Sequence, residues 1–200
     1  MKKILHIISS SRGGASHSLP LGKAIVRQLK LRYPASTVTE RKLVDDNIPY
    51  LNGSHINAFF GPEQAGNAND TNLLTYSDQI IEELKLSDII VVGSPMYNFG
   101  IPATLKAYID QIIRIGHTFK YAPDGERVGM LTGKIIYLAI TVGGKYSDTD
   151  FDPTKRFIID YLSTIFNFVG VDCIRPLTIE GTANPEFEVN YDKIAEKLWP

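Results

Sequence analysis

The segment Asp88-Ile89-Ile90-Val91-Val92-Gly93 restricts the possible folds more than any other part of this 200-residue chain. Its central residues are all apolar, so a strand formed here would bury both of its faces. Strands of this kind are typical of parallel sheets that helices cover on both sides. Residues 3–8 and 134–141 are similar apolar runs, rich in β-branched residues, and predict two further strands.

Apolar residues at helical spacing separate these runs. Leu21, Ile25 and Leu29 predict a helix that extends to about Tyr33. The remaining elements are predicted on the same grounds: strands over 37–43 and 173–179, and helices around 73–84, 105–113, 154–168 and 191–198. Because strands and helices alternate five times, we expect a single α/β domain over residues 1–200. It should contain a doubly wound, five-stranded parallel sheet with helices on both faces.

Residues 44–70 form a long polar stretch that several prolines and glycines interrupt. Loops of this length are uncommon in compact domains and often serve as functional lids. The alternative is a variable surface insertion that carries a short helix around residues 55–60. Asp70 or Thr71, at the end of the stretch, would cap the following helix.

Charge and cysteine usage narrow the class of protein. The formal net charge is −1 and the pI is about 6.4, so neither nucleic acid nor an acidic membrane surface is an expected partner. The lone cysteine, Cys173, allows no disulfide within the chain and indicates a reducing, cytoplasmic location. The N-terminal apolar run is too short for a signal peptide, and no window is long enough to span a bilayer.

The other titratable residues give no sign of a metal site. His55, His117 and Cys173 lack the spacing of metal ligands. His6 lies inside a predicted strand, where a core histidine with satisfied hydrogen bonds is the simplest interpretation. We expect Lys106 and Arg114 to be solvated or interface charges.

The first strand is followed by a segment suited to phosphate binding. Ligands of open parallel sheets bind beyond the carboxyl ends of the strands, near the position where strand order reverses. Residues 9–18 are rich in hydroxyls and glycines and lead into a helix, whose N-terminus could bind phosphate through free N–H groups and the helix dipole. Ser10, Ser16, His17 and Ser18 could add donors, or the serines could be simple helix caps.

The third strand leads into large apolar residues. Residues 94–100 place Met96, Tyr97 and Phe99 at the strand end, where they would form a bed for a flat ring such as a flavin. Asn98 could add an amide hydrogen bond. The alternative is that these side chains simply cover the end of the core.

The fourth strand ends in residues that allow close approach of the backbone. Thr141 and Val142 are followed by Gly143 and Gly144, which could meet the polar edge of a flavin or form an ordinary turn. Neither a G-x-x-x-x-G-K-[ST] nor a G-x-G-x-x-G pattern is present, so nothing in these segments specifies ATP or a dinucleotide.

Together, the three segments resemble the FMN-dependent NADH:azoreductases and NADH:quinone oxidoreductases of flavodoxin-like fold. The strongest match is the run from Ser94-Pro95-Met96-Tyr97-Asn98-Phe99-Gly100 through Pro102, continued by Leu105 to Asp110. Further matches are Ser9-Ser10, Ser16-His17-Ser18, residues 118–121, Gly129, residues 131–134, Gly143-Gly144, residues 161–164, Phe168 and Gly170. The likeness covers nearly the whole chain.

The resemblance implies an enzyme that binds FMN non-covalently. Ser10 and residues 16–18 would hold the phosphate, Pro95 to Phe99 would line the ring, and residues 141–144 would meet its far edge. Hydride would pass from NADH or NADPH through flavin N5 to a quinone or azo compound in a two-electron, ping-pong cycle. No side chain is then expected to act as an essential acid or base. The family often has Ser-Arg-Gly-Gly where this chain has Thr-Val-Gly-Gly, so the preference between NADH and NADPH stays open.

The resemblance also implies a homodimer whose sites are shared between chains. The predicted helix over 154–168 agrees, because its polar residues form one narrow stripe and apolar side chains fill the rest. Tyr121, on a hairpin that turns near residues 123–125, and Phe168 would be apolar walls of the substrate site, or else packing residues. Two rivals are a flavodoxin-type one-electron carrier, which would often be more acidic, and a nucleotide-binding regulatory module.

Overall fold

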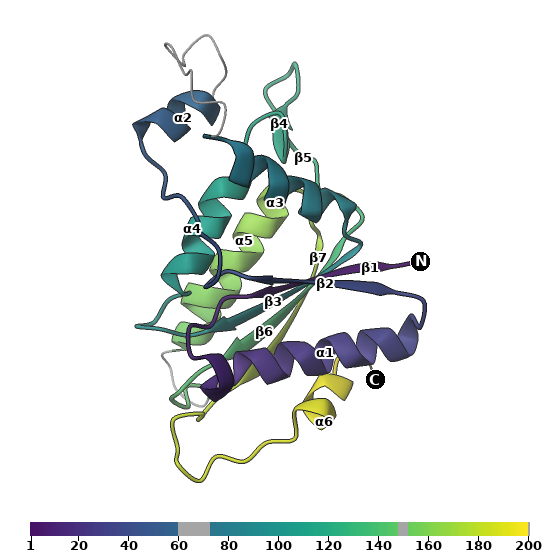
Figure 1. The fold of residues 1–200 in the computed structure, drawn as a ribbon, viewed down its shortest axis with the longest axis vertical. Coiled ribbons are helices and arrows are strands. Elements are labelled where there is room, and N and C mark those ends of the chain that lie inside the picture. Colours follow the sequence, from purple (N-terminus) through teal and green to yellow (C-terminus); the bar gives the residue numbers. More distant parts are fainter. Residues whose placement is uncertain (60–72, 148–151, 200) are drawn as a thin grey trace.

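The computed structural model describes residues 1–59, 73–147 and 152–199. Five parallel strands form one sheet in the order β2-β1-β3-β6-β7 (Figure 1). This is the strand order of the expected flavodoxin-like fold, and it reverses between β1 and β3. The strands are β1 (Lys3–Ile8), β2 (Thr37–Lys42), β3 (Ile89–Pro95), β6 (Ile135–Thr141) and β7 (Cys173–Ile179).

Burial of the strands follows their sequence patterns. The apolar runs form the central strands β1, β3 and β6, in which nearly every residue is buried. The sheet ends in β2 and β7, and these edge strands are partly exposed. Pro176, which cannot donate a ladder hydrogen bond, lies in the edge strand β7, where it costs least.

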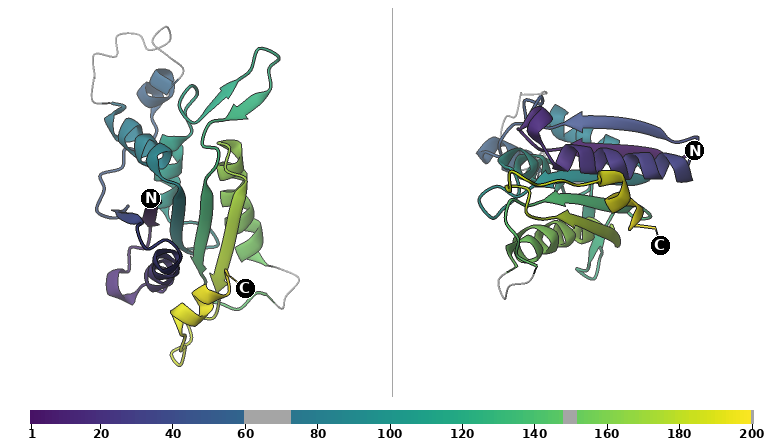
Figure 2. Two further views of the ribbon diagram at one scale, coloured as in Figure 1. Left: turned by 90° about the vertical axis from the view of Figure 1, so that its right-hand side faces the viewer. Right: turned by 90° about the horizontal axis from the view of Figure 1, so that it is seen from below.

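Helices cover both faces of the sheet (Figures 1 and 2). On one face, α1 (Ser18–Arg32) and α6 (Tyr191–Glu196) pack over Ile4 and Val91. On the other face, α3, α4 and α5 pack over Leu5 and Ile7. Because side chains alternate along a strand, β1 contributes to both layers of the core. The helices of the second face are α3 (Thr75–Leu86), α4 (Ala103–Ile112) and α5 (Asp160–Phe168).

Two predicted helices begin differently from expectation. α3 starts at Thr75 after an N-cap at Leu74, so Leu73 lies outside the helix, and the expected caps Asp70 and Thr71 lie outside the described residues. The helix predicted over 154–168 already begins at residue 153, and a π-helical segment, Lys155–Ile159, interrupts it before α5. In the polar stretch, the expected short helix is present as α2 (Gly53–Phe59), and the rest of that stretch from residue 60 onward lies outside the description.

The predicted hairpin is confirmed as β4 (Phe119–Tyr121) paired antiparallel with β5 (Arg127–Gly129). It projects away from the rest of the fold (Figures 1 and 2). Gly129 lies directly against the backbone of Gly170, where a Cβ atom on either residue would overlap the other. The hairpin is therefore anchored to the turn that follows α5.

Two charged or polar residues are buried differently from expectation. His6 has no exposed surface, as expected for a core residue, but within the described chain neither ring nitrogen has a hydrogen-bond partner. Glu40 Oε1 lies 3.7 Å from its Nδ1. Arg114 is buried rather than solvated, because it donates to Asp78 Oδ1 (2.6 Å) and Ser77 Oγ (2.9 Å).

Two negative findings apply to the residues that the structure describes. None of their helices is both long and apolar enough to cross a membrane. Their His, Cys, Asp and Glu side chains form no group of three or more that could hold a metal ion.

Candidate functional site

A cavity of about 190 Å³ lies at the carboxyl ends of β1, β3 and β6, beside the position where the strand order reverses. The sheet register brings these ends together: Ile8 pairs with Gly93, and Pro95 pairs with Thr141. This is the location at which open parallel sheets bind ligands. The lining residues are Ser10, Arg12, Ser16, His17, Pro95, Met96, Tyr97, Thr141, Gly143, Thr182 and Ala183.

One end of the cavity is rich in hydrogen-bond donors. A short 3₁₀ helix, Gly13–Ala15, turns the chain into α1. The Ser16 hydroxyl accepts from the Leu19 N–H (3.2 Å) in the first turn of α1, and it lies 3.2 Å from the Ser18 hydroxyl. The first N–H groups of a helix have no intrahelical acceptor and lie at the positive end of its dipole. Buried hydroxyls and helix N–H groups together form a site for an anion.

Positive charge and a neutral imidazole flank this end. Arg12, which sequence reasoning missed, lines the cavity from the loop before α1. Its backbone N–H donates to Ser10 Oγ (3.3 Å). Burial, together with the nearby Arg12 guanidinium, lowers the pKa of His17 below its ordinary value of 6.5. The ring is therefore neutral near pH 7 and offers one donor and one acceptor.

The apolar end is formed by a strained turn after β3. The backbone groups of Tyr97 and Gly100 bond each other in both directions, at 2.9 and 3.0 Å, around Asn98 and Phe99. These two residues have φ of 49° and 64°, as a type I′ turn requires. The conformation is tolerable for Asn98 but costs about 1 kcal/mol or more for Phe99. Such strain is common at functional sites, and here it leaves the Phe99 side chain 52% exposed at the edge of the site.

The third wall comes from the end of β6. The Met96 N–H donates to the Thr141 carbonyl (2.8 Å), which joins this wall to the turn after β3. Side chains alternate here, so Thr141 borders the cavity while Val142 is fully buried in the core. A Cβ on Gly143 would approach Ala183 to 3.3 Å, and one on Gly144 would come within 2.8 Å of the Tyr146 ring. A side chain at either position would therefore crowd these neighbours, which would have to shift to make room.

Of the predicted cofactor residues, the structure brings eight to the cavity: Ser10, Ser16, His17, Pro95, Met96, Tyr97, Thr141 and Gly143. Ser18 is buried beside the cavity, with its hydroxyl 3.2 Å from that of Ser16, and Val142 is buried in the core. Asn98, Phe99 and Gly144 lie in the adjoining turns without lining this cavity.

The C-terminal segment also contributes residues that sequence reasoning missed. Thr182 and Ala183 follow β7 and reach the cavity because their N–H groups donate to the carbonyls of Val142 and Gly143, each at 3.1 Å. This return of the chain depends on tertiary hydrogen bonds, so no local pattern in the sequence signals it. Arg12 is different, since a basic residue inside a phosphate-type loop was a signal available from the sequence.

Within one chain, the predicted substrate residues lie away from this cavity. α5 carries the chain from the carboxyl end of β6 back to the amino end of β7. Its last residue, Phe168, therefore lies near the amino ends of the strands, opposite the cavity. Phe168 packs against Phe119 of the hairpin (ring centroids 4.8 Å apart), and Tyr121 is 57% exposed. A strand of seven residues spans roughly 20 Å, so these walls do not border their own chain's cavity.

Comparisons with known proteins agree with this architecture. The family model described as flavodoxin-like fold matches residues 2–199. An FMN-dependent NADH:quinone oxidoreductase of Cellvibrio japonicus is 39% identical over 181 residues, which is 90% of this chain and 88% of that protein. A protein of the same name from Herminiimonas arsenicoxydans is 38% identical over 188 residues, covering 92% and 89% of the two chains.

A solved structure extends the likeness to three dimensions. The azoreductase from Bacillus anthracis strain Sterne superposes with a TM-score of 0.79 at 28% identity, over 99% of this chain and 93% of that one. Sequence and structure therefore agree over almost the full length, and the chain belongs to the flavodoxin-like fold family.

Proposed function

We propose that this protein is an FMN-dependent NADH oxidoreductase that reduces quinones and azo compounds. The observation that carries the proposal is the cavity at the ends of β1, β3 and β6, which joins an anion-binding end to an apolar end. The relatives named FMN-dependent NADH:quinone oxidoreductase and the similar azoreductase support this choice of cofactor and of substrates.

The donor set fits the phosphate end of FMN. Ser10 and Ser16 are almost fully buried yet border the cavity, and the first turn of α1 supplies N–H groups beside them. Arg12 adds a positive charge and His17 a neutral donor. A phosphate dianion held by these groups would have charge-assisted hydrogen bonds from several directions.

The other end fits a flat aromatic ring. Pro95, Met96 and Tyr97 offer an apolar surface, and the Tyr97 hydroxyl lies 3.4 Å from Ser10 Oγ, which ties the two ends together. Gly143 exposes backbone that a polar ring edge could approach. When bound there, FMN would supply the hydride-transfer chemistry at N5, while the protein orients it and excludes water.

A homodimer would complete the site. The cavity of about 190 Å³ is smaller than the 300–1,000 Å³ typical of pockets that enclose a whole ligand of this size, so one chain would leave the ring open. Exposed apolar residues support a second chain as the cover, namely Phe99, Tyr121, Val128, Met130 and Phe157. The rest of the predicted apolar surplus around α5 is buried or packed against the core. In this proposal, Tyr121 and Phe168 of one chain border the flavin of the other.

The proposed location is the cytoplasm, which a single cysteine of intermediate exposure, Cys173, supports. The proposed partners are small molecules and a second copy of the chain, and the near-neutral net charge supports the exclusion of nucleic acid.

Steady-state kinetics test the function. NADH and NADPH are each varied against a benzoquinone and an azo dye with the FMN-loaded protein. Parallel double-reciprocal lines and turnover of both acceptors are expected, because donor and acceptor would occupy the same place in succession. Intersecting lines would contradict the ping-pong cycle, and an FMN-binding protein that oxidises neither nicotinamide would be a flavodoxin-type carrier instead.

The dimer is tested separately. Light scattering should give twice the mass of one chain, and Tyr121→Ala should raise the KM for the quinone while leaving FMN affinity unchanged. A monomeric, fully active enzyme would contradict the shared site.

A further inference from the structure

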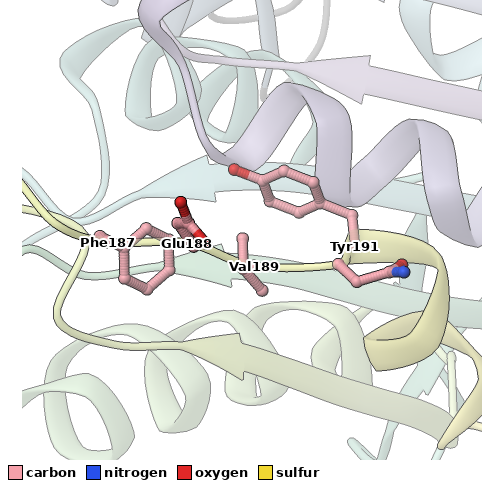
Figure 3. A pocket seen from close by; sticks show the side chains of 5 residues that line it. Phe187, Glu188, Val189 and Tyr191 are labelled. Atoms are coloured by element: carbon pink, nitrogen blue, oxygen red, sulfur yellow. The ribbon is translucent and has the colours of Figure 1, made fainter.

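The segment after β7 packs against the phosphate end of the cavity with two aromatic side chains. Phe187 and Tyr191 lie along this segment, and Tyr191 points its hydroxyl toward the start of α1 (Figure 3). The His17 ring is perpendicular to the Phe187 ring, with centroids 5.3 Å apart. His17 Nδ1 lies 2.7 Å from Tyr191 Oη, a short hydrogen bond between residues that are 174 positions apart.

The hydrogen bond determines which ring nitrogen of His17 is left for a ligand. Burial raises the pKa of the Tyr191 phenol above its ordinary value of 10, so the hydroxyl keeps its proton. Among the described residues, His17 Nδ1 is the atom that can accept a hydrogen bond from the Tyr191 hydroxyl. If Tyr191 donates to Nδ1, the neutral ring carries its own proton on Nε2. Nε2 has no hydrogen-bond partner among residues 1–59, 73–147 and 152–199, although His17 lines the cavity.

We propose that Tyr191 is a positioning residue for the flavin phosphate: with Phe187 as a wall, it holds His17 as the Nε2–H tautomer, so that Nε2–H donates to the phosphate. This inference rests on the proposed function, because it needs a phosphate-bearing flavin in the cavity. The C-terminal segment then belongs to the phosphate site, because Phe187 and Tyr191 contact His17 rather than the phosphate itself. The opposite tautomer would present a lone pair to an anion and weaken its binding.

The test compares FMN with riboflavin, which has the same ring but no phosphate. Dissociation constants are measured by quenching of flavin fluorescence for the wild type and Tyr191→Phe. Loss of one orienting hydrogen bond should weaken FMN binding about 3- to 10-fold and leave riboflavin binding unchanged. Tyr33→Phe is the matched control, since Tyr33 packs on the same core cluster at the other end of α1 and should change neither constant.

A double-mutant cycle separates positioning from general damage. In a His17→Ala background, Tyr191→Phe should have no further effect on FMN binding, because the group that it orients is gone. Equal losses for FMN and riboflavin, an unchanged FMN constant, or additive effects of the two substitutions would each overturn the proposal.

A second readout does not need flavin. ¹⁵N NMR of the flavin-free protein reports the histidine tautomers, and His17 is assigned by comparison with His17→Ala. The Nε2–H form is expected in the wild type and a mixture of both forms in Tyr191→Phe. An Nδ1–H form in the wild type would refute the inference. If the wild type binds neither flavin, the proposed function fails, and the tautomer alone then decides whether Tyr191 orients His17.

Discussion

Replacement of His6 by leucine should remove a large part of the pH dependence of stability. His6 lies in β1 with no exposed surface, facing Gly22 of α1 so closely that a Cβ on Gly22 would overlap its ring. Burial lowers its pKa to about 4, although the Glu40 carboxylate acts in the opposite direction and Lys23 in the same one. The folded protein therefore keeps this ring neutral at every pH above about 4.

The sign and size of the effect follow from the two pKa values. An unfolded chain protonates histidine near pH 6.5, whereas the folded chain does so near pH 4. Between these values the unfolded state binds a proton that the folded state does not, so the free energy of unfolding falls as the pH falls. At about 1.4 kcal/mol per pH unit, the loss reaches about 3 kcal/mol by pH 4 and stays constant below it. Above pH 6.5 the effect is absent.

Urea unfolding of wild type and His6→Leu, at matched flavin occupancy between pH 7 and pH 4.5, measures this term. Carboxylates titrate in both proteins, so the difference between the two curves isolates His6. At pH 7 the two should differ by less than about 1.5 kcal/mol, because leucine has a similar volume and no hydrogen bond of His6 is lost. By pH 4.5 the difference between the two free energies of unfolding should have moved by about 2 to 3 kcal/mol in favour of the variant. Parallel curves would refute the argument that His6 is buried in its neutral form.

Two glycine substitutions probe the site and the hairpin. Phe99→Gly should raise the free energy of unfolding by about 1 kcal/mol, because glycine tolerates the φ of 64°. It should also weaken FMN binding, because the substitution removes an aromatic ring from the edge of the site. Lower stability or unchanged FMN affinity would contradict these expectations. Gly129→Ala should cost about 1 to 3 kcal/mol in urea unfolding, because its Cβ would overlap Gly170. At Gly125 a Cβ would contact no other atom, although φ is +85°, so a substitution there should cost only the backbone strain. Equal losses of stability at Gly125 and Gly129 would contradict the packing argument.

The sheet could be predicted from the sequence because strands that are buried on both faces consist mostly of apolar residues. The apolar runs became the central strands, and the polar alternation of residues 37–42 became an exposed edge. Helix ends were less predictable. The π-helical segment at Lys155–Ile159 has no distinctive pattern in the sequence, and α3 starts at Thr75, beyond the predicted caps.

The candidate site was predictable where it lies next to strand ends and not where distant segments return to it. Alternation along β6 explains why Thr141 reaches the cavity while Val142 does not. Thr182 approaches through backbone bonds to that same strand, which only the folded chain reveals. Phe168 matches the family pattern, but the direction of α5 places it at the far edge of the sheet, so its predicted role depends on a second chain.

A crystal structure of the protein with FMN would locate the cofactor within the fold. We expect phosphate density within hydrogen-bond distance of Ser10, Ser16 and the first turn of α1, with the flavin ring against Met96 and Tyr97. A flavin bound elsewhere, or a phosphate that contacts neither serine and lies away from the helix N-terminus, would contradict this expectation.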